Sequence, residues 1–408
     1  MMHPNEHINH RDFRSMTPVT PADTVTDRFS ALRPYQDDEV ASVLSRLSHD
    51  DEFQAAIARF RLPRLDAVAP WLTRALIGYG LRRRMRGIHS ITEFQRHIAD
   101  YMEHMIERTV DGLEIHGLEA LDGNQAYLFI GNHRDISLDP AFVNFALYLH
   151  NRNTVRIAIG DNLLEKPYVS DLMRLNKSFI VPRSSTGKRE MIKAFQLLSE
   201  YIQHSIEIDN HSVWMAQRQG RAKNGIDRTD PAIIKMLCMA KRAENRDAPL
   251  AQIIAGLHVV PVSISYEYDP CDVQKARELA ATESDGSYQK LAFEDMRSIA
   301  AGIVGDKGRV NLRFGTALNG GDFDSVEALT EEIDRQVLEG YRLYPSHFLA
   351  LEKLGEHPEL LELDDVTSAD RARFEARLAE VPKELRPWWL RQYANPVINC
   401  RAPMLLDA

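Results

Sequence analysis

The stretch AYLFIGNHRDISLDPAFVNFAL, residues 126–147, joins an apolar run, a polar turn and a second apolar segment. Its first part, AYLFI, is short and bounded by turn residues, which is typical of a buried strand. Its last part, DPAFVNFAL, has the composition of a helix start. A strand that passes through a loop into a helix predicts an α/β unit, and ligands bind such units in the loops at the carboxyl ends of strands.

The same alternation continues along the chain. Further strands are predicted at 155–159, 178–181, 212–216, 258–266 and 310–314, and helices at 191–202 and from Pro231, with Asp230 as the N-cap. Strands that alternate with helices favour a mostly parallel sheet flanked by helices. We expect this α/β catalytic domain to span residues 111–345.

Three other regions flank that domain. Residues 1–36 are polar and without periodicity, so we expect a disordered N-terminus. Residues 37–110 have a helical pattern, and 346–408 are predicted to form a C-terminal helical tail. Within the N-terminal helical region, a helix over 65–86 carries apolar residues at helical spacing and ends in an arginine cluster. Its apolar face could pack as core on the catalytic domain, or dock at a membrane surface.

Composition narrows the classes of function. The 408-residue chain is 44% hydrophobic and 27% charged, with a formal net charge of -9, which argues against a nucleic-acid partner. Its three cysteines lack metal-ligand spacing, so neither a metal site nor a disulfide framework is predicted. No apolar run approaches the ~20 residues needed to cross a bilayer. The N-terminus also lacks the apolar core of a signal peptide, so we expect a cytoplasmic protein.

His133, in the loop after the first quoted strand, is the leading catalytic candidate. Asp135 and Asp139 follow it, and a carboxylate that accepts one ring N–H leaves the other ring nitrogen free to remove a proton. The alternative is a polar turn in which Asn132 and the two aspartates bond the backbone and the histidine is incidental.

Two basic clusters follow later strands. VPRSSTGKRE (181–190) contributes Arg183 and Lys188 but lacks the glycine and hydroxyl positions of a nucleotide-binding P-loop. WMAQRQGRAKNG (214–225) contributes Arg218 and Arg221 around Gly220. Each cluster suits a phosphate group, and each could instead be a solvated basic loop. Because parallel strands bring their ends to one edge of a sheet, we expect these clusters to lie near the histidine.

This order of motifs resembles the glycerolipid acyltransferase family, which includes glycerol-3-phosphate and 1-acylglycerol-3-phosphate acyltransferases. NHRDISLD (132–139) is similar to the family's histidine–aspartate block, IVPR to the block that ends in a phosphate-binding arginine, RQGRA to its glycine–arginine turn, and VVPVSI to its proline block. The resemblance covers roughly residues 111–320. It implies a catalytic pair of His133 with Asp139, and an acceptor phosphate held by Arg183, Arg221 and Lys188.

Two departures from the family pattern bear on this site. One extra residue separates His133 from Asp139, so Asp135 could replace Asp139 as the partner, although Asp139 is favoured because the following PAF run then aligns with the family's helix. Gln219 stands where the family has glutamate and can still donate and accept hydrogen bonds. We therefore expect altered acceptor binding.

The resemblance implies an O-acyltransferase of phospholipid synthesis without a cofactor. Its partners would be acyl-CoA or acyl-carrier protein, a phosphorylated glycerol acceptor, and the inner face of the cell membrane through peripheral contact. The alternatives are an acyltransferase with another lipid acceptor and a non-catalytic homologue that binds acyl-CoA or lipid. The sequence does not choose between the two donors or between the two acceptors.

Overall fold

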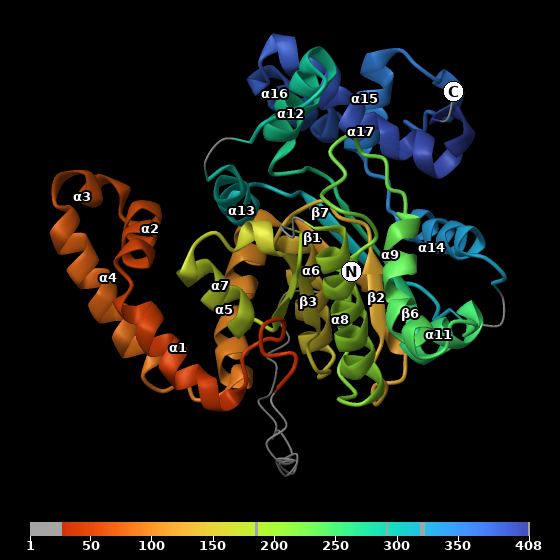
Figure 1. Cartoon of the computed structure of the whole chain (residues 1–408). Helices are drawn as coiled ribbons and strands as arrows, with labels where there is room; N and C mark the ends of the chain where they lie inside the picture. Colours follow the sequence, from red (N-terminus) through yellow and green to blue (C-terminus); the bar gives the residue numbers. More distant parts are fainter. Residues whose placement is uncertain (1–26, 184–186, 291–292, 319–322, 407–408) are drawn as a thin grey trace.

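A seven-stranded sheet forms the centre of the computed structural model, which describes residues 27–183, 187–290, 293–318 and 323–406 (Figure 1). The strand order is β1-β7-β6-β2-β5-β3-β4, and each neighbouring pair is parallel except β6 with β7. This confirms the predicted mostly parallel sheet. The strands are β1 (Gly112–His116), β2 (Leu128–Gly131), β3 (Arg156–Gly160), β4 (Ser178–Val181), β5 (Val213–Ala216), β6 (Val259–Tyr266) and β7 (Arg309–Phe314).

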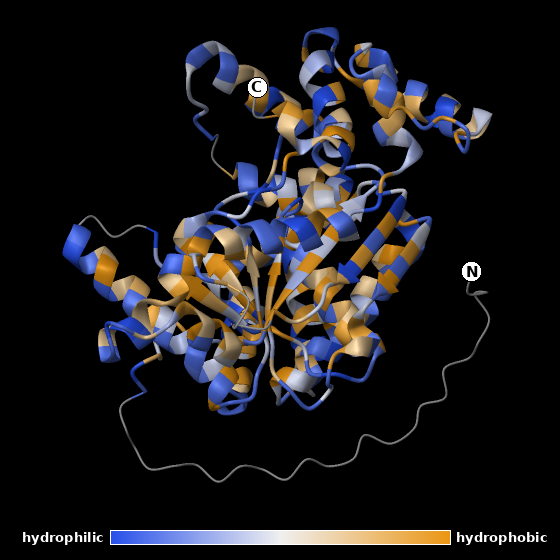
Figure 2. Cartoon of the chain, turned by 90° about the vertical axis from the view of Figure 1, so that its right-hand side faces the viewer, coloured by the Kyte–Doolittle hydropathy of each residue, from blue (hydrophilic) through white to orange (hydrophobic). Residues whose placement is uncertain are grey.

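Alternating side chains along β2 enter two separate cores. Leu128 and Ile130 pack with helices on one face of the sheet, whereas Phe129 packs with helices on the other. The first face is covered by α8 (Lys188–Glu207), α9 (Pro231–Leu237), α10 (Met239–Glu244), α11 (Leu250–Leu257) and α14 (Val326–Gly340). The second is covered by α5 (Ile91–Thr109), α6 (Leu138–Leu149) and α13 (Glu294–Val304). Figure 2 shows the apolar strands enclosed between these layers.

Between residue 27 and α5 the structure describes four helices, of which α2 to α4 form an arm that projects away from the sheet (Figure 1). The helices are α1 (Asp37–His49), α2 (Asp51–Arg61), α3 (Pro63–Val68) and α4 (Pro70–Met85); α1 also packs on α7 (Pro167–Leu175). The predicted continuous helix over 65–86 is wrong, because the chain breaks at Ala69, whose φ and ψ are -138° and 67°. Pro70 causes the break, since proline disfavours helical geometry in the residue before it.

The C-terminal helices do not form a separate tail. α15 (Pro345–Leu354), α16 (Ser368–Glu380) and α17 (Arg386–Arg401) share one apolar core with α12 (Asp272–Asp285), which lies between β6 and β7 in the chain. Together these helices form a cap over the sheet edge at which β2 and β6 end (Figure 1). The buried amide of Asn395 donates to the Asn224 carbonyl after β5, at 2.8 Å. The cap therefore supports the loops at that edge.

Candidate active site

The end of β2 lies tightly between β5 and β6. The carbonyl of Gly131 accepts a hydrogen bond from Gln217 N at 2.8 Å. A Cβ at position 131 would lie 3.2 Å from the Val262 carbonyl and 3.3 Å from Trp214 Nε1, closer than side chains normally approach. Glycine here allows three strands to end side by side, and it places the next residues at the carboxyl edge of the sheet.

His133 and Asp139 form the pair at the centre of this edge. His133 Nδ1 lies 2.8 Å from Asp139 Oδ2, and the ring meets Trp214 edge to face with centroids 5.8 Å apart. Because a carboxylate only accepts hydrogen bonds, Nδ1 is the donor in this contact, and Nε2 is the ring nitrogen left to face a substrate. The His133 side chain remains 14% exposed whereas Asp139 is 1% exposed. The pair thus consists of a reachable imidazole and a buried carboxylate.

Asp139 is held as an acceptor from four directions. Its Oδ2 also accepts from the backbone N–H groups of Arg134 at 2.6 Å and Asp135 at 2.9 Å, and its Oδ1 accepts from the Tyr266 hydroxyl at 2.8 Å. Burial, followed by the charge of Asp139, raises the pKa of Tyr266 well above its ordinary value, so this phenol stays a donor. The carboxylate is consequently fixed in position before any substrate binds.

Asp135, the alternative partner, does not bond the histidine. Its Oδ1 accepts from the backbone N–H groups of Ser137 and Leu138, each at 2.9 Å, and so caps the start of α6. Burial, and then the neighbouring charge of Asp139, raise the pKa of Asp135. The geometry thus pairs Asp139 rather than Asp135 with His133, even though one extra residue separates the two.

Buried charges brace the backbone of this loop. Arg134 lies beneath it, donates from Nη2 to Asp227 Oδ2 at 2.5 Å and is 6% exposed. From α12, Lys275 donates to the Arg134 carbonyl at 2.7 Å and forms an ion pair with Asp269. Burial alone would raise the pKa of Asp269, but the Lys275 ammonium holds it below its ordinary value. The loop is therefore anchored both to the segment that follows β5 and to the cap.

The turn after β5 meets the histidine loop directly. Ala222 N donates to the His133 carbonyl at 2.8 Å. Gly220 adopts a left-handed φ of 77°, which lets the turn fold back with little steric cost. Arg218 and Gln219 are exposed, whereas Arg221 is half-buried and its Nη1 has no hydrogen-bond partner among the described residues. The turn that carries the predicted residues 218–221 thus joins the His133 loop at Ala222, and Nη1 of Arg221 is a donor without a partner among the described residues.

Arg183 and Lys188 lie farther along the same sheet edge. Arg183 follows β4 and packs on Gly160 at the end of β3, where its Nη1 donates to Asn162 Oδ1 at 3.3 Å. Lys188 is exposed in the first turn of α8. Within the described ranges, neither residue has a hydrogen bond or ion pair with the other predicted site residues. Their roles as phosphate ligands stay predictions.

Several residues that support the site were not predicted from the sequence, among them Tyr266, Asp269 and Lys275. Tyr266 reaches Asp139 only because β6 neighbours β2, and Asp269 and Lys275 become neighbours of the loop only through the cap. In the sequence, Lys275 is followed by Arg277 and Glu278, so this stretch resembles the exposed face of an ordinary helix. Among the described residues, no group of three or more His, Cys, Asp or Glu side chains is arranged to hold a metal ion.

Comparison with known proteins gives one family match. Residues 112–265 match the model of the family described as Acyltransferase. No curated protein matches the chain. Among solved structures, the 1-acyl-sn-glycerophosphate (LPA) acyltransferase PlsC from Thermotoga maritima is similar at 12% identity, over 78% of this chain and 95% of that chain, with a TM-score of 0.37.

Proposed function

We propose that this protein is an O-acyltransferase that moves a fatty acyl group from acyl-CoA or acyl-carrier protein to a glycerol-phosphate-type acceptor. The match of residues 112–265 to the acyltransferase family model supports this proposal. The acceptor is lysophosphatidate or glycerol 3-phosphate. The observation that carries the proposal is the His133–Asp139 pair, with a reachable imidazole beside a turn that holds a half-buried arginine.

The pair supplies general base catalysis. His133 Nε2 removes the proton of the acceptor hydroxyl as that oxygen attacks the thioester carbonyl carbon. The resulting imidazolium is stabilised by the Asp139 carboxylate at 2.8 Å. When the tetrahedral intermediate collapses, the carbon–sulfur bond breaks and the imidazolium returns its proton to the departing thiolate. The products are the ester and the free thiol, and the enzyme regains its starting protonation state.

The basic residues at the carboxyl edge of the sheet would bind the acceptor phosphate. Arg221 supports this role because its Nη1 has spare donor capacity beside the histidine loop. Arg183, with Lys188, would supply further charge from β4. An arginine can donate two parallel hydrogen bonds to two oxygens of one phosphate. Such binding fixes the orientation of the attacking hydroxyl and makes the reaction effectively intramolecular. Gln219 and Arg218, exposed on the turn, would contact the remainder of the acceptor.

The arm supports peripheral contact with a membrane, where the acylated lipid product would reside. Residues 59–86 hold eight arginines and one aspartate, a net charge of +7 in a chain whose net charge is -9. Beside them Val68 is 84% exposed and Trp71 is 73% exposed. These side chains do not enter a core, so the docking interpretation is favoured over core packing, and anionic lipid on the inner face of the cell membrane is the matching surface. No described helix is both long and apolar enough to cross a bilayer.

Release of free thiol from palmitoyl-CoA tests the proposal. Purified protein would be offered lysophosphatidate and glycerol 3-phosphate in turn, and the set repeated with palmitoyl-acyl-carrier protein as donor. The variant His133→Ala should lose about 10²–10⁴ in rate, whereas His104→Ala, a change at an exposed position on α5, should not. Thiol release that is equal in both variants would exclude His133 as the base. Binding of acyl-CoA without turnover in any pairing would favour the non-catalytic alternative.

A further inference from the structure

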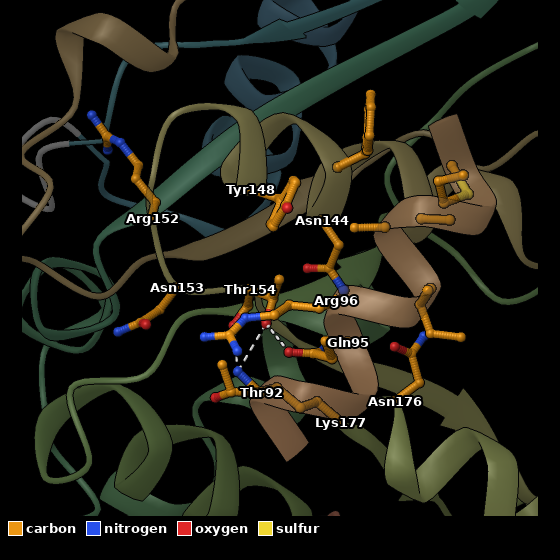
Figure 3. A pocket seen from close by; sticks show the side chains of 15 residues that line it. Thr92, Gln95, Arg96, Asn144, Tyr148, Arg152, Asn153, Thr154, Asn176 and Lys177 are labelled. Carbon is orange, nitrogen blue, oxygen red and sulfur yellow. Dashed lines mark hydrogen bonds between the residues drawn. The ribbon is translucent and has the colours of Figure 1, made fainter. Parts of the chain in front are cut away.

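A cavity of about 100 Å³ lies between α5 and α6 and reaches the loops that precede β3 and β4 (Figure 3). Thr154 and Lys177, in its wall, stand at the amino ends of these strands, whereas the candidate active site occupies the carboxyl edge. α6 runs between the two places, with Asp139 in its first turn and Tyr148 near its end. The cavity is therefore a place apart from the catalytic pair.

One end of the cavity is polar, and its hydrogen bonding is incomplete. Lys177 Nζ donates to Thr154 Oγ1 at 2.8 Å, and Thr154 Oγ1 donates to Gln95 Oε1 at 2.6 Å (Figure 3). The Gln95 Nε2 group is buried and has no hydrogen-bond partner among the described residues. A buried amide without a partner is costly, so a missing acceptor belongs next to it.

Lys177 occupies a position that usually favours glycine. It follows the end of α7 with a left-handed φ of 59°, a conformation that lysine adopts at a cost. Burial, followed by the charge of Arg156, lowers the pKa of Lys177 to about 7. None of the described residues that line the cavity is acidic. The nearby charge of Asp37 opposes this lowering of the pKa only in part, and Asp37 does not line the cavity, so the described lining residues give the amine no counter-charge.

The other end of the cavity is apolar. Ile98 and Met102 of α5 face Ala141 and Phe145 of α6 there. One water needs roughly 10–15 Å³ of such volume, so a cavity of about 100 Å³ has room for about seven to ten water-sized groups. That space accommodates an acidic group with a few carbon atoms, and it is too small for an entire fatty acyl chain.

We propose that this cavity binds a small amphiphilic anion, whose carboxylate or phosphate group meets Lys177 and Gln95 and whose short aliphatic part lies between α5 and α6. Three features match that ligand: Gln95 Nε2 lacks an acceptor, the described lining residues include no acidic group, and the cavity has one polar and one apolar end. The proposal does not depend on the acyltransfer activity, because it concerns a separate place and is tested by binding.

Calorimetric titration of the full chain tests it with hexanoate, hexyl phosphate and, as the matched neutral probe, hexanol. At least one anion should bind, and the stronger of the two identifies the acidic group. Hexanol should bind at least about tenfold more weakly, since a hydrogen bond to a charged group corresponds to about tenfold to a hundredfold in affinity. Failure of both anions to bind, or equal binding of hexanol, would overturn the proposal.

Variants locate the binding. Lys177→Met should weaken the anions about tenfold or more, whereas Lys193→Met, at an exposed position of α8, should leave them unchanged. Ala99→Phe, which fills the apolar end, should weaken the alkyl anions and thereby provides a second route if the first variant misfolds. Arg221→Met separates the cavity from the candidate active site, because only binding at the latter would be weakened. Anion binding that survives both cavity variants would refute the location.

Discussion

Replacing Asp139 by asparagine should separate the charge of the pair from its geometry. An asparagine at this position can keep its carbonyl oxygen where Oδ2 stands, facing His133 Nδ1 at 2.8 Å and the two backbone N–H groups. Its amide nitrogen would then face Tyr266, whose hydroxyl oxygen can accept instead of donating. The ring of His133 should therefore stay in place while the negative charge is lost.

The magnitude follows from Coulomb's law. The charges of imidazolium and carboxylate are spread over both groups, so their centres lie about 4 Å apart, which gives about 4 kcal/mol at an effective dielectric constant of 20. That loss corresponds to roughly a thousandfold in kcat. The cost in stability should be smaller, because removal of the charge also relieves the repulsion that helps to raise the pKa of Asp135.

The assay is the initial rate of thiol release at saturating donor and acceptor, with the melting temperature measured alongside. Tyr266→Phe is the matched control, since it removes one of four donors and leaves the carboxylate charged. We expect this control to keep most of kcat. If Asp139→Asn retained more than about a tenth of kcat while folding normally, the argument that Asp139 stabilises an imidazolium would be refuted.

Three further outcomes are expected. Arg221→Met should raise KM for the acceptor about tenfold or more with a smaller change in kcat, and an unchanged KM would exclude Arg221 from phosphate binding. A double change of Val68 and Trp71 to glutamate should abolish cosedimentation with anionic vesicles, and retained sedimentation would rule out docking through the arm. Burial raises the pKa of Asp334 from 3.8 to about 6, so its ionisation destabilises the fold above about pH 6, and protonation restores stability as pH falls toward 4. The side chain of Asp334→Asn can still accept from Thr229. In denaturant titrations this variant should raise the free energy of unfolding by at most about 3 kcal/mol at pH 7.5 and by less at pH 5. Equal gains at both pH values would contradict this.

Most of the sheet could be predicted from sequence because β2 to β7 are apolar runs bounded by turn residues. β1 was missed because GLEIH is a half-exposed edge strand with a central glutamate, so it lacks a buried run. The antiparallel direction of β7 also leaves no mark in a local pattern. The direction of β7 is decided by its pairing with β6, which is distant in the sequence.

The candidate site was predictable where one block of sequence contains all its parts, as for His133 and Asp139. The choice between Asp135 and Asp139 needed three dimensions, because Asp135 is occupied in capping α6. The prediction of one continuous helix in the arm was wrong for a different reason. Its apolar spacing predicted one helix, but Pro70 breaks the helix at Ala69. The spacing alone could not reveal that Val68 and Trp71 are left exposed by the described part of the chain.

The placement of β1 next to β7 bears on how the chain folds during synthesis. Gly112 pairs with Arg309, and β7 also covers the edge of β6. At about 5–20 residues per second, β1 waits about 10–40 s on the ribosome before its partner emerges. A fragment that ends at residue 265, where the family match ends, would leave β1 unpaired and the edge of β6 open to other chains. The shortest N-terminal fragment that contains all seven strands of the sheet therefore extends through Phe314.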